Sequence, residues 1–178
     1  MIVTDASPWG IGGWISIEGV IVSFFYDRVT DEDAAALQTE VGSHLGQQSF
    51  EGLAMLVALK CWREHWQQHY TLLHCKADNV AVLYLLARCS GSGPGLGLIA
   101  RELALLLAQN AHTPQALSHV PGVANLVADV LSRRWDPRQT SWSLPPALAG
   151  AVRILPPVRD MSFWKVLQAE EEFMRDVQ

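Results

Sequence analysis

The chain has 178 residues, 49% of them apolar and 17% charged, which excludes intrinsic disorder and favours one globular domain with an appendage. Its net charge of −5 argues against binding to nucleic acid by bulk electrostatics alone. No apolar stretch approaches the roughly 20 residues that cross a bilayer, so we expect no membrane contact. Three widely spaced cysteines form neither a disulfide framework nor a zinc motif, which favours a reducing intracellular compartment, cytoplasm or nucleus.

The first 48 residues predict three strands and a short helix. Residues 1–17 and 20–27 are rich in β-branched, aromatic and other apolar residues, with breaks at Ser7-Pro8 and Glu18-Gly19. We therefore expect a strand, a turn and then a hairpin. Residues 30–48 indicate a short helix, capped by Thr30 or Asp31, and then a loop.

From residue 49 the apolar residues take the spacing of a helix. Ser49 is the candidate N-cap, and the apolar stripe consists of Phe50, Leu53, Ala54, Val57, Ala58 and Cys61. The remaining pattern predicts, in order, a strand at 70–78, a helix at 79–89, a flexible connection at 90–97, a helix at 98–110, a strand at 115–120 and a helix at 123–134. Strands first, then alternating helices and strands, predict a mixed α/β sheet with helices on its faces.

The composition changes after Arg134. Residues 135–178 are rich in tryptophan, proline and small polar residues, and only 163–177 have a helical pattern. We therefore divide the chain into a folded domain at 1–134 and a C-terminal extension at 135–178 that resembles a linker or docking segment and ends in a helix.

Four acidic residues stand where a purely structural sequence would not place them: Asp5, Glu51, Asp78 and Asp129. Each has a structural alternative when taken alone, such as a turn residue for Asp5, a helix-dipole partner for Glu51 and an N-cap for Asp78. Together they form a candidate metal cage, because neighbouring carboxylates stay ionised only with a cation between them. Oxygen ligands of this kind suit Mg²⁺ or Mn²⁺.

Four motifs resemble the ribonuclease H domain of retroelement polyproteins. They are "TDAS" at 4–7, "FEGLAMLVAL" at 50–59, "KADNVAVLYLLAR" at 76–88 and "HVPGVANLVADVLSR" at 119–133, so that the resemblance covers about residues 2–134. It implies an α/β fold with a five-stranded mixed sheet ordered 3-2-1-4-5 and helices on both faces.

The resemblance also implies an activity and the residues that carry it. The expected reaction is two-metal-ion hydrolysis of the RNA strand of an RNA–DNA hybrid, with two Mg²⁺ ions that Mn²⁺ can replace. The matching metal-binding and catalytic residues are Asp5, Glu51, Asp78 and Asp129, with His119 as a mobile proton carrier on the loop to Gly122. Expected substrate-binding residues are Ser7, Asn79 and Asn125. A reverse transcriptase, fused or adjacent, is the implied partner.

Two departures from the family pattern leave alternatives open. Position 77 is alanine, where the family usually has a small hydroxyl residue before the aspartate. Arg101 is the only lysine or arginine within 89–112, so the basic substrate-binding protrusion of some cellular members is absent. We therefore expect weak affinity for a hybrid. One alternative is a catalytically inactive connector or interaction domain of the same fold. Another is a transposase or integrase that acts on DNA, although such enzymes normally use three acids with a final glutamate.

Overall fold

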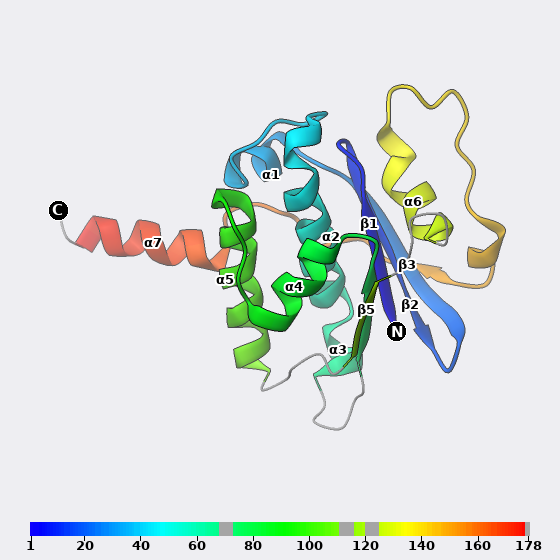
Figure 1. Cartoon of the computed structure of the whole chain (residues 1–178), viewed down its shortest axis with the longest axis horizontal. Coiled ribbons are helices and arrows are strands. Elements are labelled where there is room, and N and C mark those ends of the chain that lie inside the picture. The colour runs from blue at the N-terminus through cyan, green and yellow to red at the C-terminus, as the bar shows by residue number, and fades with distance from the viewer. Residues whose placement is uncertain (68–72, 111–115, 120–124, 177–178) are drawn as a thin grey trace.

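A mixed β-sheet forms the centre of the computed structural model, which describes residues 1–67, 73–110, 116–119 and 125–176 (Figure 1). Its order is β5-β4-β1-β2-β3-β6. The six strands are β1 (Ile2–Ala6), β2 (Gly10–Ile17), β3 (Val20–Arg28), β4 (His74–Ala77), β5 (Ala116–His119) and β6 (Val152–Arg153). β2 is antiparallel to β1 and β3, and the other pairings are parallel. The predicted order 3-2-1-4-5 is therefore confirmed, and β6 adds a sixth strand beside β3.

Helices cover both faces of this sheet (Figure 1). The α-helices are α1 (Asp31–Ala36), α2 (Gln47–Cys61), α3 (Arg63–Trp66), α4 (Val80–Arg88), α5 (Pro94–Gln109), α6 (Leu126–Ser132) and α7 (Lys165–Asp176). Helix α2 lies between the sheet and helices α4 and α5, in the larger apolar core. Helix α6 packs on the opposite face, where Phe24, Leu131 and Leu148 form a smaller core. None of the described helices is long and apolar enough to cross a membrane.

The strand register places Asp5, Gly12 and Tyr26 in one row across β1, β2 and β3. Paired residues of neighbouring strands point to the same face, here the face that α6 covers. Glycine is needed at position 12, because a Cβ there would lie 2.5 Å from the Cβ of Leu131 in α6. This close approach brings the end of α6 to the end of β1.

Two expectations about helix boundaries are wrong. Ser49 is not an N-cap, because α2 begins at Gln47 directly after the 3-10 turn His44–Gly46, and the Ser49 side chain packs against α5 at Gly95. Glu51 therefore lies in the second helical turn. The predicted flexible connection over 90–97 ends early, because α5 begins at Pro94, and proline is well suited to a first helical position. The Thr30 cap of α1 is confirmed, with a capping box formed by Thr30 and Asp33.

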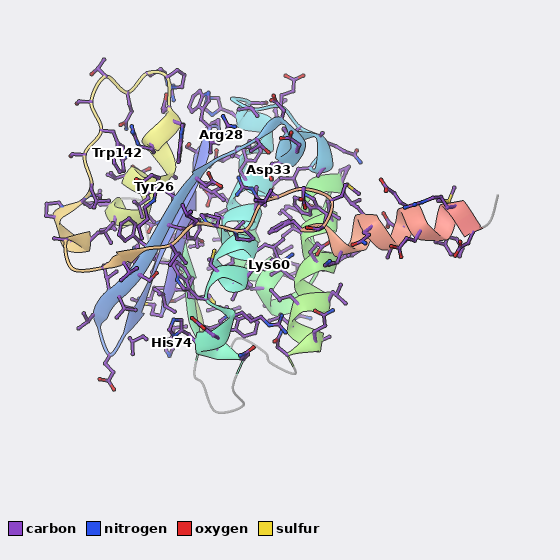
Figure 2. The ribbon with its side chains drawn as sticks, turned by 180° about the vertical axis from the view of Figure 1, so that it is seen from behind. Tyr26, Arg28, Asp33, Lys60, His74 and Trp142 are labelled. Atoms are coloured by element: carbon purple, nitrogen blue, oxygen red, sulfur yellow. The ribbon has the colours of Figure 1, made fainter. Side chains whose placement is uncertain are left out.

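The C-terminal extension packs on the domain over much of its length. After β6 it runs over α2, where Lys60 Nζ donates to the carbonyl of Phe163, and reaches α7 on the side of the molecule nearest the viewer in Figure 2. Arg159 is buried and pairs with Asp33 at 2.8 Å and with Asp27 at 2.6 Å, while Trp164 is 1% exposed. Helix α7 then projects away from the body and has no buried residue (Figure 1). The domain boundary at residue 134 stays a prediction.

Candidate metal centre

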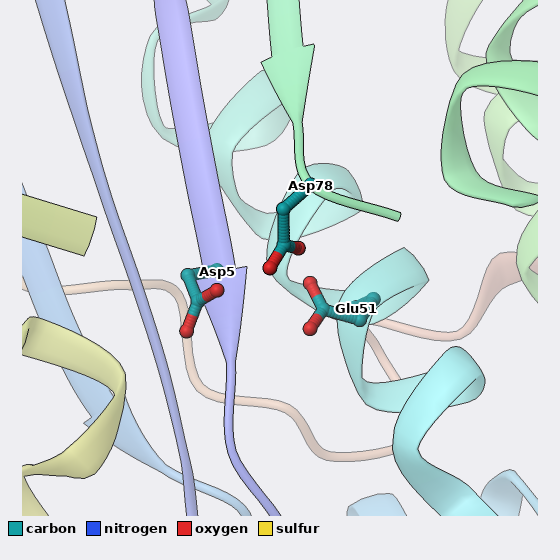
Figure 3. Close-up of side chains that lie close together, drawn as sticks. All are labelled: Asp5, Glu51 and Asp78. Atoms are coloured by element: carbon teal, nitrogen blue, oxygen red, sulfur yellow. The ribbon is translucent and has the colours of Figure 1, made fainter. Parts of the chain in front are cut away.

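Three carboxylates from three separate elements meet at one edge of the sheet. Asp5 is near the end of β1, Asp78 follows β4, and Glu51 comes from α2; one oxygen from each lies within 4.8 Å of the others. Figure 3 shows the three side chains pointing toward a common centre. β1 and β4 are parallel neighbours, so their carboxyl ends lie side by side. The fold therefore brings together residues that are up to 73 positions apart in the sequence.

Burial makes this arrangement unfavourable for three negative charges. Asp5 and Glu51 are each only 4% exposed. Burial and, to a smaller extent, the charges of Asp78 and Asp129 raise the pKa of Asp5 to about 7. A hydrogen bond from Ser132 lowers this pKa, but by less than burial raises it. Burial and the neighbouring charges of Asp5 and Asp78 raise the pKa of Glu51 well above its usual range. A cation among the carboxylates would relieve both effects, because it favours the ionised forms.

Hydrogen bonds hold two of the carboxylates in place. The Ser132 hydroxyl donates to Oδ2 of Asp5 at 2.6 Å, and Gln47 Nε2 donates to Oε1 of Glu51 at 2.9 Å. Gln47 Nε2 also donates to the carbonyl of Ala6, which ties α2 to the end of β1. The other oxygen of Glu51, Oε2, is buried and has no hydrogen-bond partner among the described residues. A buried acceptor of this kind has a free site for a cation.

Asp129 lies outside the group of three carboxylates. Its Oδ1 accepts a hydrogen bond from Nε of Arg133 at 2.6 Å, an ion pair between residues one helical turn apart. Its negative charge still contributes to the raised pKa values of Asp5 and Asp78. The structure thus places Asp129 beside the other three acids with its own positive partner.

His119 lies at the end of β5, paired with Ala77 of β4. Its side chain is exposed, and Nε2 is 2.9 Å from the carbonyl oxygen of Asp78. The nearby imidazole of His119 lowers the pKa of Asp78, although burial of Asp78 raises it more. The expected loop from His119 to Gly122 falls at 120–122 outside the described residues.

The three residues expected to bind substrate all make hydrogen bonds within the protein. Ser7 is buried, and its hydroxyl donates to the carbonyl of Ser132 at 2.8 Å and accepts from the Gly10 amide. Asn79 caps α4 by accepting from the Ala81 amide. The Asn125 amide donates to the carbonyl of Thr4 at 3.1 Å and to Asp5 at 3.4 Å. Asn125 is thus placed to orient Asp5, and its Oδ1 is buried without a partner in the described part of the chain.

Sequence reasoning missed Gln47, Ser132 and Arg133. A signal existed for two of them, because Gln47 is four residues before Glu51 and Arg133 is four after Asp129, the spacing at which helical side chains meet. The bond from Ser132 to Asp5 joins residues 127 positions apart, so no local pattern indicates it.

Two solved structures resemble this chain across most of its length. One is the LC11-RNase H1 isolated from compost by a metagenomic approach, with a TM-score of 0.55 and 18% identity over 73% of this chain and 89% of that one. The other is RNase H1 from the halophilic archaeon Halobacterium salinarum NRC-1, with a TM-score of 0.53 and 19% identity over 73% of this chain and 91% of that one.

The chain has the ribonuclease H fold. No family model matches the sequence, and no curated protein matches it either. Asp5 and Asp78 lie at the ends of two central strands, which is where an open α/β sheet commonly holds its ligand, and Glu51 reaches them from α2.

Proposed function

We propose that the chain is a metal-dependent endonuclease that hydrolyses the RNA strand of RNA–DNA hybrids. The observation that carries the proposal is the convergence of Asp5, Glu51 and Asp78 within 4.8 Å in a ribonuclease H fold. The two neighbouring structures are named RNase H1, and the sequence motifs that contain these acids resemble the same class of domain.

The three carboxylates suit divalent metal ions, and we propose Mg²⁺, which Mn²⁺ can replace. All of their ligand atoms are oxygens, the kind that Mg²⁺ and Mn²⁺ prefer. A cation at this position would give the buried Oε2 of Glu51 a partner and would lower the raised pKa of Asp5. When bound, two such ions supply an activated water and charge stabilisation for the leaving oxygen.

The protein's own residues orient this site and move protons. Ser132 and Asn125 hold Asp5 from the α6 side, and Gln47 holds Glu51. We assign Asp129 to the site as a fourth acid, because its charge acts on Asp5 and Asp78, and in the metal-free chain it pairs with Arg133. We propose that the exposed imidazole of His119, whose Nε2 is 2.9 Å from the carbonyl oxygen of Asp78, carries a proton toward the departing 3′ oxygen.

Ser7 and Asn79 are proposed to position the ends of β1 and β4, where we expect the substrate to bind. Ser7 fixes the turn after β1, and Asn79 fixes the start of α4 next to Asp78. Recognition of a hybrid would then depend on 2′-hydroxyls and groove shape instead of base sequence. Cleavage is therefore expected to tolerate many sequences.

The wider setting of the proposal is a retroelement protein with a reverse transcriptase as neighbour. It rests on the resemblance of residues 2–134 to retroelement ribonuclease H domains, above all in the segment 119–133. Addition of the neighbouring polymerase is expected to raise the affinity for hybrid, which a titration of labelled hybrid with and without it would measure.

A substrate panel tests the proposal. The full chain is incubated with Mg²⁺ and with labelled RNA–DNA hybrid, single-stranded RNA or duplex DNA, and the products are resolved by length. We expect cutting of the RNA strand of the hybrid alone, leaving 5′-phosphate ends. Cutting of duplex DNA would indicate a DNA-acting nuclease of the same fold, and a folded chain that cuts nothing and binds no Mn²⁺ would indicate a connector. Either result would refute the proposal.

A further inference from the structure

Positive charge is concentrated in the first part of the C-terminal extension. Residues 133–159 contain five arginines and a single acid, Asp136, so this segment has a net charge of +4. The rest of the chain has eight lysines and arginines against seventeen acids, a net charge of −9. A chain that is acidic overall therefore carries a basic segment directly after α6.

Three of these arginines lie on aromatic rings: Arg138 lies on Trp9, and Arg134 and Arg153 lie on two rings that contact each other. The guanidinium carbon of Arg134 is 4.7 Å from the centre of the Trp142 ring, and that of Arg153 is 3.9 Å from the centre of the Tyr26 ring. The Tyr26 and Trp142 rings are themselves 5.2 Å apart, and Figure 2 shows them side by side near α6. We call these four residues, Tyr26, Arg134, Trp142 and Arg153, the arginine–aromatic surface.

The charges of Arg134 and Arg153 are available to a ligand. Both side chains are exposed, and within the described ranges neither has a carboxylate at ion-pair distance. The other three arginines of the segment each pair with an aspartate. Stacking on a ring restrains a guanidinium while its N–H edges remain free, so a bidentate contact with an anion loses less side-chain entropy.

The arginine–aromatic surface lies on the same face of the sheet as Asp5. Tyr26 is in the same cross-strand row as Asp5, two strands away. At the usual strand spacing this corresponds to roughly 10 Å between the two Cα atoms. Arg134 follows Ser132, which contacts Asp5, by two residues. A duplex that enters the carboxylate site would reach the surface within about three base-pair steps of 3.4 Å.

An indole hydrogen bond and a strand pairing hold the surface in place. Trp142 Nε1 donates to the carbonyl of Val130 in α6 at 2.7 Å, which fixes the extension to the helix that contacts Asp5. Arg153 belongs to β6, which pairs with β3 at Phe24, two residues from Tyr26. Arg134 and Arg153 therefore lie on segments attached to α6 and β3, and α6 contacts the carboxylate site through Ser132.

We propose that the arginine–aromatic surface binds the sugar–phosphate backbone of the nucleic-acid duplex whose RNA strand reaches the carboxylates. This inference rests on the proposed function and adds the substrate contact made by the extension. Planar guanidinium groups match phosphate oxygens in two parallel hydrogen bonds, and contacts of this kind are insensitive to base sequence. The surface would supply basic contacts that residues 89–112 lack.

The test compares two double variants of the full chain. Arg134→Ala/Arg153→Ala removes the two free guanidinium groups, and Arg101→Ala/Arg175→Ala removes the same charge from α5 and α7, where both arginines pair with glutamates. Binding of a fluorescent RNA–DNA hybrid is measured by anisotropy in EDTA over a range of salt concentrations. Cleavage of the same hybrid is measured in parallel with Mg²⁺, and far-UV circular dichroism checks the fold.

We expect the first variant to bind hybrid about tenfold or more weakly near 0.1 M salt, with the slope of log K against log salt smaller by about 2, one contact for each arginine. The control variant should bind as the wild type does. A third variant, Arg134→Lys/Arg153→Lys, should keep most of the salt slope, which separates loss of charge from loss of packing. Equal binding by the first variant and the wild type would overturn the inference while leaving cleavage, and so the proposed function, intact. A wild type that binds through these arginines but cuts no hybrid would support the surface and refute the nuclease.

Discussion

The hydroxyl of Ser132 donates a hydrogen bond of 2.6 Å to Oδ2 of Asp5 and joins the end of α6 to the end of β1. This bond is the main interaction that lowers the pKa of Asp5, but burial raises the pKa by more. The same hydroxyl contacts the carbonyl of Asp129, and the Ser132 carbonyl accepts from Ser7. One serine thus connects the helix, the strand and the turn around the candidate metal centre.

Removal of this hydroxyl should weaken metal binding. We expect Ser132→Ala to lower the affinity for Mn²⁺ by about tenfold, because groups that orient a metal ligand commonly affect affinity by at least this factor. Isothermal titration calorimetry measures the change, with Ser143→Ala, at an exposed position, as the control. An unchanged affinity in Ser132→Ala would show that Asp5 keeps its orientation without the bond.

The metal-free protein should lose stability as the pH rises from about 4 to about 7. The pKa of Asp5 is about 7 in the folded chain and near 3.8 in the unfolded chain, so the folded state binds more protons in this range. The free-energy cost of burying the Asp5 charge is absent below the pKa of the unfolded chain and complete above the pKa of the folded chain. Thermal unfolding in EDTA at several pH values measures the effect.

Two comparisons test the origin of this pH dependence. Asp5→Asn should reduce the loss of stability with rising pH. At pH 8 it should raise the melting temperature by a few degrees, which corresponds to about 1 to 2 kcal/mol of unfolding free energy in a chain of this size. Excess Mg²⁺ should stabilise the wild type more at pH 8 than at pH 5, and it should have little effect on the variant. If the stability of Asp5→Asn still fell with rising pH as that of the wild type does, the pH dependence would have to come from other groups.

Arg133 should oppose the binding of a cation near Asp129. The two side chains form a partly exposed ion pair, 40% and 32% accessible, of the kind that contributes up to about 1 kcal/mol. We expect Arg133→Ala to bind Mn²⁺ roughly two- to fivefold more tightly, because Asp129 loses its competing partner. Arg133→Lys, which keeps the charge, is the control, and weaker binding by the alanine variant would contradict this account.

The buried ion pair between Arg159 and Asp33 should make the extension necessary for stability. Both side chains are at most 2% exposed, so removal of the arginine leaves a buried, uncompensated carboxylate. We expect Arg159→Met to cost about 3 to 5 kcal/mol of unfolding free energy. Urea denaturation measures this loss, and Arg159→Met combined with Asp33→Asn should recover part of it. A loss below 1 kcal/mol in the single variant would mean that the extension contributes little through this contact.

The sheet and most of the metal centre could be predicted from local sequence. The hairpin at Glu18-Gly19 has both residues at positive φ, as the turn signal requires, and Thr30 caps α1 as expected. Asp5 and Asp78 were recognisable because each stands near the end of an apolar strand. Parallel pairing of β1 with β4 then brings them together.

Other features depend on contacts that sequence patterns do not encode. Nothing local indicates that Arg159 pairs with Asp33, 126 residues earlier, or that Trp142 and Tyr26 lie together. Ser49 lies inside α2, which begins at Gln47, and its side chain packs against Gly95 of α5, a contact 46 residues away in the sequence. The ion pair of Asp129 with Arg133 differs from these contacts, because its spacing of one helical turn is visible in the sequence.

The most direct test of the central claim is the cleavage of a labelled RNA–DNA hybrid by the full chain and by Asp78→Asn in the presence of Mg²⁺. Glu172→Gln, on the exposed surface of α7, is the matched control for loss of one acidic charge. The account predicts that the wild type and the control cut the RNA strand, that EDTA stops both, and that Asp78→Asn is folded and at least a thousandfold slower. Undiminished cutting by Asp78→Asn would contradict the proposed site.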